Sequence, residues 1–179
     1  TTASENTAVG YNALTSNVTG VANTAVGEEA LKNTTASNNT ACGMEALKAN
    51  TTGTQNVAVG TAALDANTTA SNNVGIGVSA LGATTTGQKN VAVGTTALGA
   101  NTTGENNVAV GKDALLSNTT ATKNVAVGSL TLDANTTGAS NAAVGYNVLG
   151  ANTTGSSNVA MGDGALTSST TASNNTAIG

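Results

Sequence analysis

The feature that most constrains the fold of this chain is an internal repeat that runs through its 179 residues. The unit reads N-V-A-V-G-x-x-A-L-x-A-N-T-T-G-x-x, and we number its positions 1 to 17. Nine of the ten spacings between copies are 17 residues, and one is 16, which we attribute to a residue missing between Leu31 and Asn33. The Asn-X-Ala-X-Gly segment, with Gly75 replacing Ala once, begins at Asn6, Asn23, Asn39, Asn56, Asn73, Asn90, Asn107, Asn124, Asn141, Asn158 and Asn175.

This period favours a β-solenoid, because the common helical repeats need about 33 residues or more. Gly at position 5 and the surrounding Val, Thr and Asn also disfavour a helix. The unit predicts one coil of an all-β parallel β-solenoid: a strand at positions 1–4, a Gly turn, a second short strand around Ala-Leu, and an Asn-Thr-Thr turn. At about 4.8 Å per coil, about ten and a half coils would make a rod roughly 50 Å long. We interpret residues 1–179 as a single repeat domain and as a segment of a longer fibre.

Besides Asn at position 1, two positions hold the same residue in all their copies. A Gly at position 5 predicts a turn that needs positive φ or close approach of the backbone. The glycines at this position are Gly10, Gly27, Gly43, Gly60, Gly77, Gly94, Gly111, Gly128, Gly145, Gly162 and Gly179. Leu at position 9 is the one large apolar side chain of each complete copy. We expect a core ladder of Leu14, Leu31, Leu47, Leu64, Leu81, Leu98, Leu115, Leu132, Leu149 and Leu166.

Composition excludes several function classes. With no His and one Cys, the chain can build neither a His/Cys zinc site nor a Ser-His-Asp triad. Five Lys and no Arg leave no basic patch for nucleic acid. The carboxylates are scattered over positions 6, 7, 10, 16 and 17, as solvated surface residues would be. We therefore expect no enzyme, no cofactor, no metal, no nucleic-acid partner and no membrane span in this segment.

The first strand of the unit predicts self-association. Positions 2 to 4 are commonly Val-Ala-Val, so both faces of this strand are apolar and need cover. A single thin solenoid covers only one of them, whereas bundled solenoids cover both. Cys42 replaces Val at position 4, and we expect it to be a small buried hydrophobic residue.

Three polar features are candidate sites. The Asn column at position 1 is interpreted as an internal ladder between coils, with a ligand-facing ladder as the alternative. Stacked Thr at positions 13 and 14 raises an ice-binding hypothesis, although adjacent Thr in a strand point to opposite faces. Asn-X-Thr triplets fit the N-glycosylation pattern but also follow from turn chemistry; they are Asn17, Asn33, Asn50, Asn67, Asn101, Asn118, Asn135 and Asn152.

Units such as NTAVGYNALTSNVTG, NTACGMEALKANTTG and NVAVGTTALGANTTG resemble the head repeats of trimeric autotransporter adhesins. They are equally similar to shaft repeats of bacterial and phage tail fibres, although this unit is longer than the usual adhesin-head repeat. The resemblance covers essentially the whole chain. It implies a homotrimeric, left-handed parallel β-roll, displayed extracellularly on a cell or virion surface and used for attachment.

The sequence thus predicts a structural surface fibre, the shaft or head of an adhesin or tail fibre. Its partners would be other copies of itself, most simply as a homotrimer, and a host-surface glycan or protein. Two exposed-turn tyrosines, Tyr11 and Tyr146, are weak candidates for stacking on a sugar. The alternatives are a monomeric ice-binding β-solenoid and a glycosylated structural filament or sheath subunit without a receptor.

Overall fold

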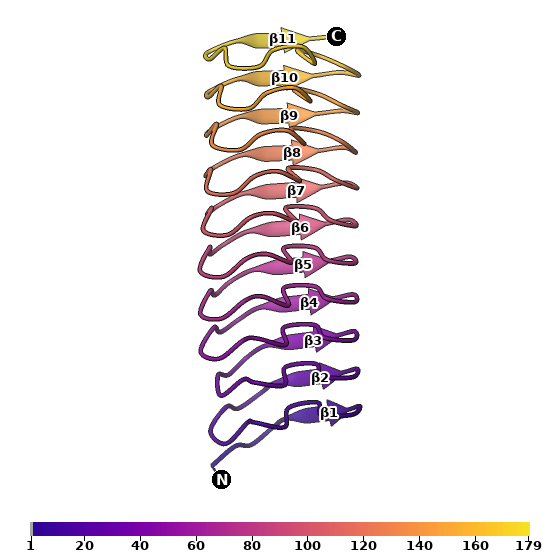
Figure 1. Ribbon diagram of the computed structural model, residues 1–179, viewed down its shortest axis with the longest axis vertical. Helices are drawn as coiled ribbons and strands as arrows, with labels where there is room; N and C mark the ends of the chain where they lie inside the picture. The colour runs from indigo at the N-terminus through magenta and orange to yellow at the C-terminus, as the bar shows by residue number, and fades with distance from the viewer. Residues whose placement is uncertain (1) are drawn as a thin grey trace.

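The computed structural model describes residues 2–179, and in it the chain forms a stack of coils with one strand per coil (Figure 1). All strands join one parallel sheet in chain order. Partner residues lie one repeat apart, as in Val57 opposite Val74. The predicted all-β parallel β-solenoid is confirmed. The strands are β1 (Thr7–Val9), β2 (Thr24–Val26), β3 (Thr40–Cys42), β4 (Val57–Val59), β5 (Val74–Ile76), β6 (Val91–Val93), β7 (Val108–Val110), β8 (Val125–Val127), β9 (Ala142–Val144), β10 (Val159–Met161) and β11 (Thr176–Ile178).

Hydrogen bonds between coils continue beyond the short strands. The Leu64 amide donates to the carbonyl of Ala80 at 3.0 Å, and the Thr51 amide donates to that of Thr68 at 2.9 Å. Backbone donors and acceptors on several sides of the coil are therefore paired along the rod, although only three residues per coil are strand. The two termini lie at opposite ends of the rod (Figure 1).

The prediction of a second strand around the Ala-Leu pair is wrong, because this part of the coil consists of two successive tight turns. In one coil the Ala63 amide donates to the Gly60 carbonyl at 3.3 Å, and the Asn67 amide donates to the Leu64 carbonyl at 3.1 Å. Ala62 and Leu64 both have φ of 53°, in the left-handed region. A strand needs extended φ at every residue, so the left-handed residues at positions 7 and 9 exclude it.

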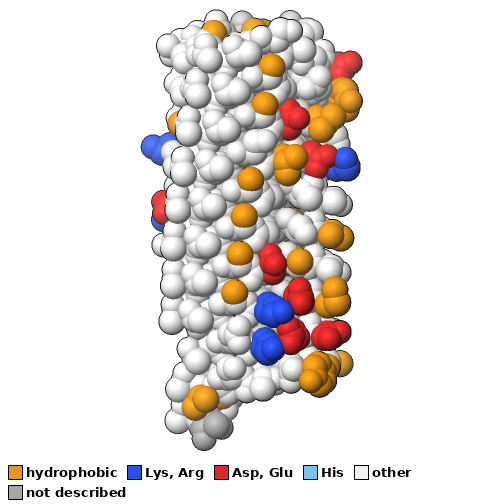
Figure 2. Space-filling model, in the orientation of Figure 1, with side chains coloured by type: hydrophobic (Ala, Val, Ile, Leu, Met, Phe, Trp, Pro, Cys, Tyr) orange, Lys and Arg blue, Asp and Glu red, His pale blue; other side chains and the backbone are white. Residues whose placement is uncertain are grey.

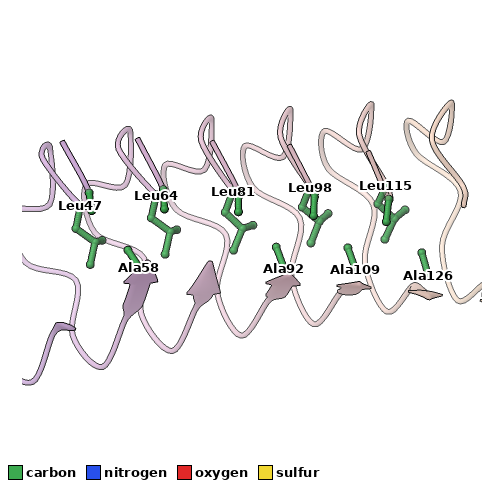
Figure 3. Packing of buried hydrophobic residues seen from close by; sticks show 14 of the residues in the cluster. Leu47, Ala58, Leu64, Leu81, Ala92, Leu98, Ala109, Leu115 and Ala126 are labelled. Atoms are coloured by element: carbon green, nitrogen blue, oxygen red, sulfur yellow. The ribbon is translucent and has the colours of Figure 1, made fainter. Parts of the chain in front are cut away.

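The interior of the coil is filled by small and branched apolar side chains. Ala58 from the strand and Ala63 and Leu64 from the turns are all buried. Figure 3 shows the Leu side chains of successive coils stacked in a row, facing the row of strand Ala residues. The fully buried Leu residues are Leu31, Leu47, Leu64, Leu81, Leu98, Leu115, Leu132 and Leu149, whereas Leu14 and Leu166 lie in the end coils and are less completely covered.

Position 5 combines the two features that favour glycine, a positive φ and a close approach of neighbouring backbone. Gly60 has φ of 130°, which L side chains rarely adopt, and an added Cβ would lie 2.6 Å from the carbonyl oxygen of Gly77. The same conformation recurs in the other coils, with φ between 115° and 142°. The glycine column therefore lets neighbouring turns approach more closely than any side chain would allow.

The 16-residue coil loses its residue at a different place from the one inferred from the sequence. The Thr34 amide donates to the Leu31 carbonyl, which is the bond that Asn50 makes to Leu47 in the next coil. Thr34 therefore occupies position 12 and is buried, while Asn33 occupies position 11 and is exposed. The missing residue falls at position 14, in the outer turn. Deletion there preserves the tight turn that begins at the core leucine.

Candidate functional site

The position-1 asparagines form an internal ladder. The backbone amide of Asn56 donates to Oδ1 of Asn39 at 3.0 Å, and Asn73 repeats this bond to Asn56. The Asn56 Nδ2 donates to the carbonyl of Ala70 at 2.9 Å, across its own coil. These buried amides use their polar atoms inside the rod, so the ladder joins coils and is not available to a ligand.

A second ladder runs through position 12. Asn118 Nδ2 donates to Oδ1 of Asn101 at 2.9 Å and to the carbonyl of Ala121 at 3.3 Å. The candidate glycosylation asparagines consequently divide into two groups. Asn17 is half-buried and Asn33 is exposed, but the others have no accessible surface in the folded chain: Asn50, Asn67, Asn101, Asn118, Asn135 and Asn152.

This second ladder is interrupted where position 12 is not asparagine. Thr84 follows Asn67 in the column, and Ser169 follows Asn152. Oδ1 of Asn67 and Oδ1 of Asn152 are the two buried side-chain polar atoms in residues 2–179 that lack a hydrogen-bond partner. The cause is local: neither shorter side chain makes the hydrogen bond to the preceding Oδ1 that an asparagine amide makes elsewhere in the column.

The threonine columns differ in their availability to solvent. At position 13 the hydroxyl of Thr68 donates to the carbonyl of Thr85 at 3.2 Å, and that of Thr102 donates to Thr119 at 3.1 Å. These hydroxyls therefore join coils. The position-14 threonines, such as Thr86, are exposed.

The outer sheet face carries exposed and half-buried apolar side chains along most of the rod. Because position 3 points inward, positions 2 and 4 point outward, and Val59 is 36% exposed and Met161 50%. No charged residue occupies either column. We define the outer sheet face by its two columns: Thr7, Thr24, Thr40, Val57, Val74, Val91, Val108, Val125, Ala142, Val159 and Thr176, and Val9, Val26, Cys42, Val59, Ile76, Val93, Val110, Val127, Val144, Met161 and Ile178.

Cys42 lies on this outer sheet face and is exposed in the single chain. The expectation of a buried cysteine is therefore wrong for one chain. The sequence shows that position 4 is always apolar, which suggests burial, but the strand directs this column away from the coil interior. Its exposure makes Cys42 a natural reporter of whether the face is covered.

Beside the sheet, position 6 forms a row that we call the turn ridge. Its residues directly follow the position-5 glycines and are exposed, except for the half-buried Ser129. Tyr11 and Tyr146 both lie on it, eight coils apart, with exposures of 72% and 56%. Figure 2 shows hydrophobic side chains protruding at intervals along one edge of the rod. The turn ridge consists of Tyr11, Glu28, Met44, Thr61, Val78, Thr95, Lys112, Ser129, Tyr146 and Asp163.

Charged side chains gather near the N-terminal end of the face seen in Figure 2. Lys48 Nζ lies 2.6 Å from Glu29 and 2.9 Å from Glu45, and Lys32 lies 2.6 Å from Glu29. Hydrogen bonds from Lys32 and Lys48 lower the pKa of Glu29 to about 2. Sequence reasoning treated these residues as scattered, but both Glu-to-Lys pairs have a spacing of three residues and recur one coil later. Burial, by contrast, raises the pKa of Asp65.

Residues 2–179 contain neither a pocket nor a cluster of metal-ligating side chains, that is, three or more His, Cys, Asp or Glu residues grouped to hold a metal ion. The described residues also include no helix suited to cross a membrane. The extended surfaces, rather than a concave site, are therefore the candidate functional features.

No family model, curated protein or solved structure matches this chain. Its class follows from its own geometry: it is a β-solenoid repeat protein with coils of about 17 residues and stacked asparagine ladders.

Proposed function

We propose that this chain is the non-catalytic rod of an extracellular fibre, in which copies associate side by side through the outer sheet face. The observation that carries the proposal is the uninterrupted absence of charge from a face that is apolar along most of the rod. At about 4.8 Å per coil and about 10 Å of width, this face covers roughly 500 Å², which is within the range of the largest patch on a single chain, a patch that is often functional.

Three parallel copies are the arrangement we favour. The likeness of the repeats to adhesin-head and tail-fibre repeats supports a homotrimer of left-handed coils on a cell or virion surface. In such a bundle each copy places its outer sheet face against the others and keeps its polar turns in solvent. Attachment would then depend on reach and on many linked weak contacts with a host glycan or protein.

The first test compares the native and denatured masses of the purified chain. We expect a native mass of three times 17.0 kDa. Val59→Asp should reduce it to that of a single chain, because association would bury a carboxylate without a partner. The matched control is Thr52→Asp, which places the same charge on another exposed position of the neighbouring coil and should leave the mass unchanged.

The second test uses Cys42. A maleimide should modify the thiol slowly in the native assembly and rapidly in Val59→Asp, because the thiol is exposed in one chain. A parent protein that is monomeric, and whose Cys42 reacts as fast as in urea, would contradict the proposal. Such a monomer should then be examined for thermal hysteresis, the property expected of an ice-binding rod.

A further inference from the structure

The turn ridge alternates in chemistry from one coil to the next. After the odd-numbered strands β1, β3, β5, β7 and β9, position 6 is Tyr, Met, Val, Lys and Tyr; after the even-numbered strands β2, β4, β6, β8 and β10, it is Glu, Thr, Thr, Ser and Asp. Aromatic, apolar or cationic side chains thus recur every second coil, about 9.6 Å apart, and acids or aliphatic hydroxyls lie between them. Neither the coil interior nor the sheet requires this two-coil period, because position 6 is outside both.

We propose that the turn ridge binds the turn ridge of a second copy of this chain in antiparallel orientation, with the coil of strand n opposite the coil of strand 11 − n. Because the two strand numbers add up to an odd number, every Tyr, Met, Val or Lys of the ridge lies opposite an acid or an aliphatic hydroxyl. This particular register also pairs all ten ridge residues. The ridge is straight enough for such a contact, since the loops after the strands form one edge of the rod in Figure 1.

The pairing is chemically complementary at both ends. Tyr11 meets Asp163 of the second copy, and Tyr146 meets its Glu28, so that phenol hydroxyls can donate to carboxylates. The two-fold axis repeats each pair, which gives four Tyr–carboxylate contacts per interface. In the centre, Val78 meets Thr95 and Thr61 meets Lys112. A parallel arrangement shifted by one coil forms only two Tyr–carboxylate pairs and would continue as an open filament instead of closing.

This contact uses a different surface from the one proposed for side-by-side association. The ridge lies beyond the position-5 glycines, at the edge of the sheet, so a bundle joined through the outer sheet faces can still present its ridges. The inference therefore concerns contacts between two rods or two bundles, and it can fail or succeed independently of the proposed function.

Cysteine cross-linking tests the register directly. In a Cys42→Ser background, we would oxidise the double variant Thr61→Cys/Lys112→Cys under mild conditions and separate the products without reductant. Residue 61 of one copy lies opposite residue 112 of the other, so a covalent dimer is expected as the main product. Each single variant should remain monomeric on the gel, since its like residue in the partner is three coils, about 14 Å, away.

A charge variant checks that the ridge itself carries the contact. Tyr11→Glu/Tyr146→Glu, added to the double-cysteine chain, should reduce the covalent dimer at least tenfold, because like charges then face Asp163 and Glu28. Native mass of the same variant shows whether association through the outer sheet face persists. Efficient cross-linking of the single variants would indicate a parallel, in-register contact and overturn the proposal. Absence of a dimer from the folded double variant would also overturn it.

Discussion

Replacing Thr84 by asparagine should stabilise the rod, because it fills one of the gaps in the position-12 ladder. In the native chain Asn67 Oδ1 is buried without a partner, and the Asn101 amide reaches Thr84 Oγ1 only at 3.4 Å. An asparagine at position 84 can donate to Asn67 and accept from Asn101, as Asn118 does where the ladder is continuous. A buried unpaired acceptor costs about 1–3 kcal/mol and a net hydrogen bond contributes about 1 kcal/mol, so we expect a gain of about 2 kcal/mol.

Urea unfolding and native-state amide exchange of the coils around β5 and β6 would measure this gain. Exchange is needed because repeat proteins open locally and do not always unfold in two states. Asn118→Thr should produce a loss of similar size, since it creates the same interruption elsewhere. Thr86→Asn alters an exposed residue of the same coil and should have little effect. If Thr84→Asn leaves protection unchanged while Asn118→Thr lowers it, the orphaned oxygen carries no penalty and the reasoning is refuted.

Other substitutions address the turns, the core and the charges. Ala62→Gly should be more stable than Ala66→Gly by about 1–2 kcal/mol in thermal unfolding, because only residue 62 has left-handed φ; equal effects would argue against strain at this turn. Gly60→Ala should lose at least about 2 kcal/mol to the clash with the next coil and to its φ. Leu64→Ala should cost about 2–5 kcal/mol in urea, and a smaller loss would mean that the core is loosely packed. Glu29 has its pKa lowered from 4.5 to about 2, so its stabilising contribution is complete above pH 4.5 and disappears as the pH falls toward 2. Melting temperatures of Glu29→Gln should show a weaker acid dependence over that range than the parent.

The repeat makes the fold largely predictable. A fixed period, one leucine per unit and a glycine at position 5 of every unit are sufficient to predict stacked coils, since each unit must present the same face to its neighbours. The sequence also indicates that the asparagine column is internal, because a ligand site seldom needs the same residue in every coil.

The path of the chain within one coil is less predictable. Leu64 has left-handed φ, a conformation that bulky residues rarely adopt and that no propensity assigns to leucine. Here it is maintained because the Leu64 amide and side chain are held by the next coil and the core. Cys42 was misplaced for a related reason: an apolar column indicates burial but does not say whether the covering surface belongs to the same chain.

The orientation of the coil-to-coil hydrogen bonds determines how this rod would respond to force. Because these bonds run along the rod axis, tension applied at the two termini loads successive coils in series, and the end coils can detach one at a time. Each detached coil releases 17 residues of contour length, up to about 58 Å, from a layer only about 4.8 Å thick. A rod roughly 50 Å long therefore stores a contour length of several hundred ångströms, and a fibre built from it could lengthen greatly before its covalent chain bears the load.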